Sequence, residues 1–222
     1  MSPKGSSHKR QAVVAAARDQ FFKFGYRRVT MNDIAKTAKM SRPALYLIFP
    51  SKEKIFSAVV LQLAQELSDR ARALAAAAPG PKEKLRAVFN AWAIESFDLY
   101  CGSSEARELH DASVEFTPEA LLKSVSMLEL DLVRALQSVP TRTLPEGVSK
   151  AEIAQLLASS LDGFKRTCRQ CVGVGRYGRQ HASPYRAWLA LRIFAVGCPA
   201  TDLLAVVIGT LTLSESPPIP QS

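Results

Sequence analysis

Apolar and polar positions follow a helical period in two short segments between residues 30 and 52, and a tight turn separates the two segments. The first segment begins with a threonine that can cap a helix, has an aspartate three positions later, and then repeats apolar residues on one face: Thr30, Asp33, Ile34, Ala35 and Ala38. The second segment has Ser41 as its N-cap and Pro43 in its first turn, and it directs Leu45 and Phe49 inward. The pattern predicts two helices joined at residues 39–40.

The other face of the second predicted helix points outward. It carries Arg42, Pro43, Ala44, Tyr46 and Leu47. Pro50 ends this helix, Ser51 caps the next one, and Lys52 falls in the first turn that follows. Two short helices that cross at a tight turn, with the second one presented, match a helix-turn-helix that lays its recognition helix in the major groove of DNA.

Helical periodicity continues along the rest of the chain and predicts an all-α protein. Helices are expected at 7–24, 51–78, from 82, at 104–115, from 117, and at 149–171 and 184–196, while 203–213 fits either a helix or an extended arm. The AAAAPGP stretch marks a boundary. We expect a helix-turn-helix head with a basic, flexible N-terminal arm at 1–52, a connecting helix at 53–80, a helical ligand-binding and dimerisation domain at 81–213, and a flexible tail at 214–222.

The charge distribution supports nucleic acid as the partner of the head. Up to Ile55 the chain has 12 Lys and Arg residues against three acidic ones, so this segment alone accounts for the net charge of +9. The remainder has 17 basic and 17 acidic residues and is neutral. A positive charge confined to the segment with the motif is the electrostatic footprint of a DNA-binding domain. The alternative is that these positive charges only keep the protein soluble.

The stretch from Ala15 to Phe56 strongly resembles the N-terminal domain of TetR-family transcriptional regulators. The matching residues are Ala16, Phe21, Gly25, Tyr26, Thr30, Asp33, Ile34, Ala35, Ala38, Ser41, Leu45, Tyr46, Phe49, Ser51, Lys52 and Glu53. Two positions depart from the family pattern. Lys39 stands where the family has glycine in the turn, which predicts either a strained positive φ at a cost of about 1 kcal/mol or a slightly different turn. Ile48 stands where the family has a polar aromatic residue or histidine, and it removes one polar contact to DNA.

The resemblance implies roles for the predicted DNA-binding residues. Tyr46 and Lys52 would contact phosphates, and Thr30 would donate to another phosphate. Arg42 would read a base, since a guanidinium pairs with O6 and N7 of guanine. Pro43, Ala44 and Leu47 would make apolar contacts, for instance to thymine methyl groups. Arg28, which precedes the motif, is expected to reach the DNA backbone or an adjacent groove.

The resemblance also implies a C-terminal domain that dimerises and encloses a small-molecule pocket. Aromatic and polar residues are candidates to line it: Trp92, Glu95, Phe97, Tyr100, His110, Phe116 and Met127, with Asp98, Asp111 and Glu115 as further polar partners. Unpaired carboxylates there would favour a cationic ligand. A plain hydrophobic core needs the same aromatic spacing, so that interpretation stays open.

The sequence gives little support to a metal site, to catalysis or to a membrane location. Cys168 and Cys171 form a lone CxxC, which leaves structural metal, thiol redox sensing or ordinary cysteines open, and we expect no metal because no second close pair follows. No catalytic constellation or nucleotide loop occurs, so we expect no enzyme and no cofactor. The N-terminus lacks a signal-type apolar run and no long apolar run spans a membrane, which predicts a cytoplasmic protein.

Three functions are therefore compatible with the sequence, in the following order of preference. The first is a homodimeric TetR-like regulator, predicted to be a repressor, that binds a near-palindromic operator in double-stranded DNA and is released by a small-molecule effector. Its dimer contact is expected at 149–171 and 184–196. The second is a helical enzyme or small-molecule carrier with a basic head. The third is a non-specific DNA-binding protein, which a specificity ratio near one would reveal.

Overall fold

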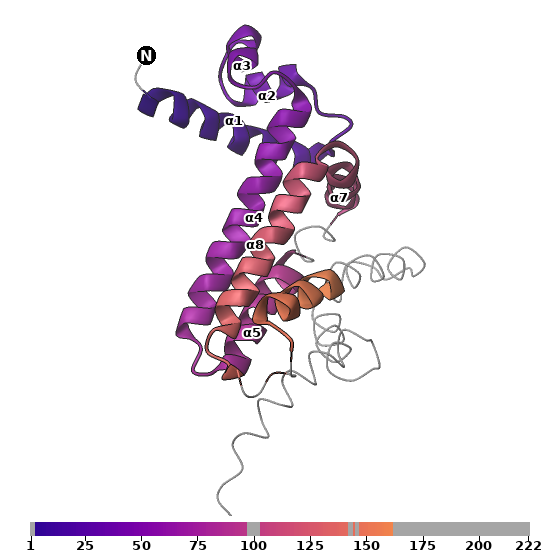
Figure 1. The fold of residues 1–222 in the computed structure, drawn as a ribbon. Helices are drawn as coiled ribbons and strands as arrows, with labels where there is room; N and C mark the ends of the chain where they lie inside the picture. Colours follow the sequence, from indigo (N-terminus) through magenta and orange to yellow (C-terminus); the bar gives the residue numbers. More distant parts are fainter. Residues whose placement is uncertain (1–2, 97–102, 142–143, 145–146, 162–222) are drawn as a thin grey trace, which may run out of the picture. The chain divides into compact units, whose positions relative to one another are not determined.

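The computed structural model describes residues 3–96, 103–141, 144 and 147–161 of the 222-residue chain. Within these ranges the chain forms helices and contains no strand, which confirms the predicted all-α class (Figure 1). The elements are α1 (Pro3–Phe24), α2 (Met31–Thr37), α3 (Arg42–Ile48), α4 (Lys52–Ala77), α5 (Pro81–Phe89), the π-helix η1 (Asn90–Glu95), α7 (Ser104–Phe116) and α8 (Pro118–Leu136). Residues 150–161 are helical as well.

Two elements differ from the prediction. Helix α1 begins at Pro3 rather than at Ser7, so the expected flexible arm is helical from that residue onward. Proline suits a helix start because its fixed φ is already helical and its missing N–H would have no intrahelical partner there. The helix expected from residue 82 changes to a π-helix at Asn90–Glu95, a wider winding that periodicity alone does not reveal.

The chain divides into two compact units. The first contains Met1–Leu67 and Glu95–Met127, and the second begins with Ser68–Ile94 and resumes at Leu128. The first unit thus joins the helix-turn-helix segment to α7 and the start of α8. The boundaries at 52/53 and 80/81 that the sequence predicts stay predictions. Within the described ranges, no helix combines the length and apolar character needed to cross a membrane.

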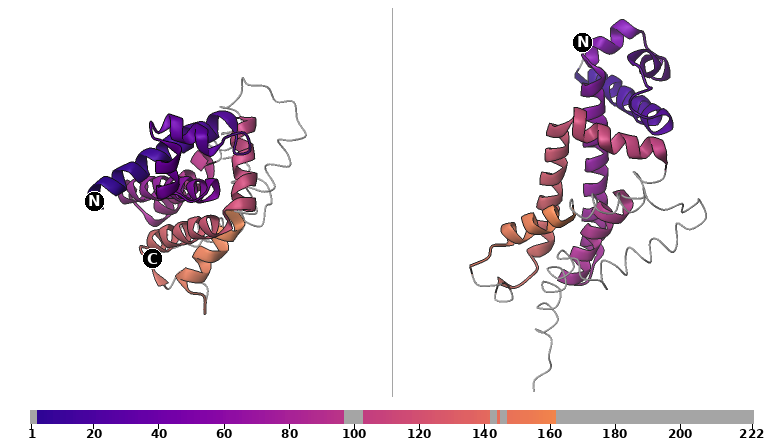
Figure 2. Two further views of the ribbon diagram at one scale, coloured as in Figure 1. Left: turned by 90° about the horizontal axis from the view of Figure 1, so that it is seen from above. Right: turned by 90° about the vertical axis from the view of Figure 1, so that its right-hand side faces the viewer.

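The core of the first unit is aromatic at its centre. The rings of Phe21 and Phe56 meet edge to face with centroids 5.2 Å apart, and Tyr26 lies 4.7 Å from Phe56 and 4.9 Å from Phe116. Aliphatic residues from all the helices of the unit surround these rings, among them Val13, Ala17, Ile34, Leu45, Ile55, Val59, Leu63, Leu109 and Ala112. Helices α1 and α7, far apart in the sequence, therefore lie side by side (Figure 2).

The second unit buries a polar contact among apolar residues. Trp92 from η1 donates its indole N–H to Asp131 Oδ2 of α8 at 3.1 Å, and the Asp131 side chain is only 1% exposed. Arg134 Nη1 lies 3.1 Å from the other carboxylate oxygen. Leucine and other aliphatic side chains of this unit are also buried: Leu85, Val88, Leu132, Leu136, Val139, Ile153, Leu157 and Leu161.

Candidate nucleic-acid interface

Both short helices of the motif begin at side-chain caps, as the sequence predicts. Thr30 and Asp33 form a complete capping box on α2, in which the Asp33 N–H donates to Thr30 Oγ1 at 3.3 Å and Asp33 Oδ2 accepts the Thr30 N–H at 3.0 Å. Ser41 Oγ accepts the Ala44 N–H at 3.3 Å and caps α3. These caps fix where each helix starts, and they therefore fix the residues that α3 presents.

The turn between the helices confirms the positive φ predicted for Lys39. Lys39 has φ of +54°, the left-handed conformation that glycine usually supplies. Its N–H donates to Lys36 O at 3.1 Å, and the Met40 N–H donates to Ala35 O at 3.0 Å. This pair of hydrogen bonds is a Schellman motif, which satisfies carbonyls at the end of α2 and offsets the strain. The side chain of Met40 also packs against the core of the first unit.

Helix α3 turns the predicted face outward. Leu45 and the C-cap residue Phe49 are buried, whereas Leu47 is 90% exposed and Tyr46 41% exposed. Arg42 and Pro43 are exposed as well, and Ala44 is half-buried. A leucine so fully exposed on a seven-residue helix contributes nothing to the core, and its exposure fits a surface made to be covered.

The exposed basic residue of α3 is held by its neighbour one turn along the helix. Arg42 Nη2 lies 3.4 Å from the hydroxyl of Tyr46, and the guanidinium carbon lies 5.6 Å from the centre of the Tyr46 ring. On α1, the guanidinium of Arg10 lies 4.2 Å from the ring of Phe49, at the end of α3. Sequence reasoning missed the Arg10 contact, because nothing in the spacing of residues 10 and 49 indicates it.

Lys52 has a structural role that the sequence did not reveal. Its ammonium donates to the carbonyl oxygens of Tyr26 and Val29, both at 3.1 Å, and it lies 4.3 Å from the centre of the Tyr26 ring. Burial lowers the pKa of Lys52. Burial likewise raises the pKa of Tyr26, whose hydroxyl donates to Glu53 at 3.3 Å. One ammonium N–H of Lys52 remains for a phosphate, and that contact stays a prediction.

Two further predicted DNA contacts engage protein groups in the structure. The hydroxyl of Thr30 donates to Asp33 Oδ2 at 2.6 Å, and this hydrogen bond is the largest cause of the lowered pKa of Asp33. Arg28 Nη2 lies 3.1 Å from Glu105 Oε1 of α7. The predicted DNA-binding residues on α3 therefore share one exposed surface, whereas Thr30, Arg28 and Lys52 have partners within the protein.

The predicted ligand-binding residues belong to different units. Trp92 is buried in the second unit, while Glu95, His110, Phe116 and Met127 belong to the first. Phe116 stacks on Tyr26 and so joins the core of the first unit. Phe97, Tyr100 and Asp98 lie outside the described residues, as do Cys168, Cys171 and most of the expected dimer helices. Within the described ranges no three His, Cys, Asp or Glu side chains gather as metal ligands would.

Comparison with known proteins agrees with this geometry. Residues 13–59 match the family described as bacterial regulatory proteins, tetR family. The chain is 39% identical over 57 residues to the HTH-type transcriptional regulator RutR of Escherichia coli, covering 26% of this chain and 27% of RutR. It is 29% identical over 85 residues to the uncharacterized HTH-type transcriptional regulator YhgD of Bacillus subtilis, covering 38% of this chain and 44% of YhgD. The chain thus spans less than half the length of the curated relatives it matches.

Solved structures extend the similarity of fold beyond the head. A TetR-family transcriptional regulator from Pectobacterium atrosepticum has a TM-score of 0.61 at 20% identity, over 97% of this chain and 96% of its own. A TetR-family structure from Mesorhizobium loti has a TM-score of 0.59 at 18% identity, over 96% and 98% of the two chains. At such identities the likeness concerns the fold.

Proposed function

Because its N-terminal segment belongs to the TetR family of bacterial regulatory proteins, we propose that this chain is a sequence-specific DNA-binding transcriptional regulator. The observation that carries the proposal is the surface of α3: a capped helix that exposes Arg42, Pro43, Tyr46 and Leu47 on a segment with 12 Lys and Arg residues against three acidic ones. Charge draws a protein to any DNA, whereas an ordered set of exposed side chains on one helix reads sequence.

The proposed contacts divide between bases and backbone. Arg42 is the base reader, and its guanidinium is held beside the Tyr46 ring, which limits its conformational freedom before binding. Leu47 and Pro43 offer apolar contact to thymine methyl groups. Tyr46 meets a phosphate through its hydroxyl.

The remaining contacts lie on the DNA backbone and depend on groups that the structure shows engaged within the protein. Lys52 would use its third N–H, while Arg28 would reach a phosphate from the turn between α1 and α2, and Thr30 from the N-cap of α2. Ala44, half-buried in the first turn of α3, allows the helix backbone to approach the groove closely.

We further propose that the regulator works as a homodimeric repressor in the cytoplasm. Two heads would place their recognition helices in successive major grooves about 34 Å apart, and the operator would then be near-palindromic. A small-molecule effector would release the protein by binding more tightly to a head spacing that DNA does not accept, since only differential affinity shifts such an equilibrium. The full-length likeness of fold to TetR-family structures supports this part of the proposal.

Selection of binding sites from random duplex DNA at near-physiological salt tests the function. We expect an enriched site with dyad symmetry. Binding without sequence preference would refute a specific regulator and favour a non-specific DNA-binding protein.

The same selection repeated with Arg42→Ala tests the base reader. We expect a loss of about 1–3 kcal/mol and relaxed preference at one base pair in each half-site. Lys123→Ala, which removes the same charge from an exposed position on α8, is the matched control and should leave the preference intact. An unchanged preference in Arg42→Ala would show that Arg42 reads no base.

A further inference from the structure

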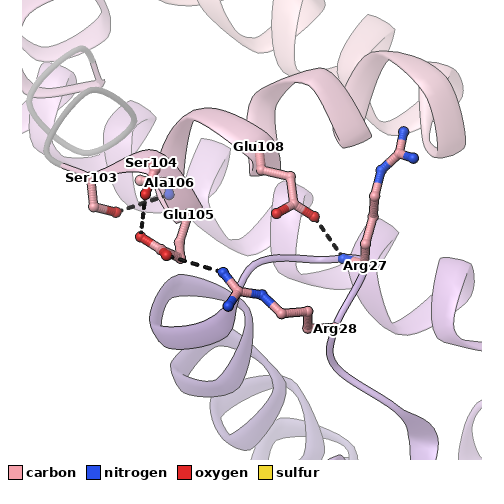
Figure 3. A network of polar contacts seen from close by, with 7 residues as sticks. All are labelled: Arg27, Arg28, Ser103, Ser104, Glu105, Ala106 and Glu108. Atoms are coloured by element: carbon pink, nitrogen blue, oxygen red, sulfur yellow. Dashed lines mark hydrogen bonds and ion pairs between the residues drawn. The ribbon is translucent and has the colours of Figure 1, made fainter.

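Three glutamates of α7 contact the turn that joins α1 to α2, and Figure 3 shows two of them, Glu105 and Glu108. Glu108 Oε1 accepts the backbone N–H of Arg27 at 2.7 Å. Glu105 Oε1 lies 3.1 Å from Arg28 Nη2, and Glu115 Oε2 lies 3.3 Å from Arg27 Nη2. A backbone contact thus fixes the position of the turn, and two ion pairs occupy its arginine side chains.

The position of the Glu108 carboxylate against this turn depends on a missing side chain. Gly25 has φ of +79°, and a Cβ atom at that position would lie 2.3 Å from Glu108 Oε2. The start of α7 is also ordered, because Ser103 accepts the Ala106 N–H at 3.0 Å and the Ser104 hydroxyl donates to Glu105 Oε2 at 2.9 Å. Hydrogen bonds from its own backbone N–H and from Ser104 lower the pKa of Glu105, so this carboxylate is charged at neutral pH.

The two arginines are held at the surface and are not buried. The Arg27 side chain is 72% exposed and that of Arg28 is 68% exposed. Surface ion pairs of this kind are weak, so another anion can replace the glutamates. A phosphate presents oxygen acceptors to a guanidinium much as a carboxylate does. The turn leads directly into Thr30, the cap of α2, and so belongs to the flank of the helix-turn-helix.

We propose that α7 competes with DNA for the arginines of this turn: Glu105 and Glu115 occupy Arg28 and Arg27 in place of DNA phosphates. The proposal rests on the proposed DNA-binding function. The contact is autoinhibitory, because each arginine must leave a glutamate before it binds the backbone of DNA. Glu108, which accepts the main-chain N–H of Arg27, keeps the turn beside α7 while the side chains exchange partners.

A double-mutant cycle on full-length protein tests the competition, with the operator duplex recovered from site selection as the probe. Glu105→Gln keeps the shape of the side chain and removes its charge. We expect Glu105→Gln to bind the operator about two- to fivefold more tightly per protomer, the range in which exposed ion pairs contribute. Arg28→Gln should bind less tightly, and adding Glu105→Gln to it should bring no further gain.

The salt dependence of binding gives a second readout. If Glu105 withholds Arg28 from a phosphate, Glu105→Gln should steepen the slope of log K against log salt by about 0.9 per protomer. Glu119→Gln removes the same charge from an exposed first-turn position of α8 and controls for the general effect of net charge.

The outcomes separate this proposal from the proposed function. Gains that are equal in Glu105→Gln and Glu119→Gln, or effects of Glu105→Gln and Arg28→Gln that simply add, would overturn the competition and leave the regulator intact. A wild-type protein that binds no duplex specifically would overturn both. Thermal unfolding of each variant would show that the changes in binding do not come from loss of fold.

Discussion

Replacement of Gly25 by alanine should destabilise the protein for two separable reasons. The first is backbone strain, because an alanine held at φ of +79° costs about 1–2 kcal/mol. The second is the Cβ atom itself, which would lie 2.3 Å from Glu108 Oε2 and would force that carboxylate away from the Arg27 N–H. A hydrogen bond to a charged group contributes about 1.5–3 kcal/mol, and the exposure of this one favours the lower end. We expect a total loss of about 2.5–3.5 kcal/mol.

The chain offers a matched control in Gly147. Its φ of +78° is nearly the same, but a Cβ atom there would meet nothing within 4 Å. Gly147→Ala should therefore lose only the backbone term of about 1–2 kcal/mol. Urea unfolding followed by far-ultraviolet circular dichroism, at one fixed protein concentration, measures both free energies.

Removal of the carboxylate isolates the second term. In a Glu108→Ala background, Gly25→Ala should cost no more than Gly147→Ala does in the wild type, because the new Cβ atom then has room. The reasoning is refuted if Gly25→Ala is no more destabilising than Gly147→Ala, or if its cost is the same with and without Glu108.

Two further predictions concern polar contacts. Thr30→Val should cost about 0.5–2 kcal/mol at pH 7 by removing the capping box, while Thr30→Ser should cost much less. The Thr30 hydroxyl lowers the pKa of Asp33 below its ordinary 3.8. The stabilisation that this hydrogen bond gives through the charged carboxylate is therefore complete above that value and is lost as the pH falls through the folded-state pKa. Urea titrations should accordingly show a smaller difference in unfolding free energy between the Val and Ser variants at pH 3 than at pH 7. Trp92→Phe should cost about 1–3 kcal/mol in unfolding experiments, because it takes the indole donor from the buried carboxylate of Asp131. Arg134→Ala, which removes a half-exposed ion-pair partner of the same carboxylate, should cost under about 1 kcal/mol.

Features that depend on nearby residues could be predicted from the sequence. The caps at Thr30 and Ser41 were predictable because a cap joins groups three residues apart. The positive φ of Lys39 was expected because Lys39 stands where the resembled family has glycine in the turn. The inward direction of Leu45 and the outward direction of Leu47 followed from the helical period.

Contacts between distant segments could not be predicted in the same way. Arg27 and Glu108 are 81 positions apart, and neither carries a local sign of the other. Charged residues on an exposed helix face look alike whether they meet water, a ligand or another helix, and Glu115 was therefore expected near a ligand although it pairs with Arg27. Periodicity identifies the face that is buried without identifying what covers it. For this reason the sequence left both pocket lining and core open for Phe116, which the structure places against Tyr26 in the core.

Lys52 shows why a basic residue in a DNA-binding motif needs structural analysis before it is assigned to phosphate. The ammonium satisfies two carbonyls of the segment between α1 and α2, and it covers the Tyr26 ring at the centre of the core. Its loss would release that segment, which also carries Arg27 and Arg28, and DNA affinity would then fall even if Lys52 never met a phosphate. Weakened binding in a Lys52 variant therefore does not distinguish contact from positioning. A change in salt slope without a change in stability does distinguish them, because only the loss of a phosphate contact alters counterion release while leaving the fold intact.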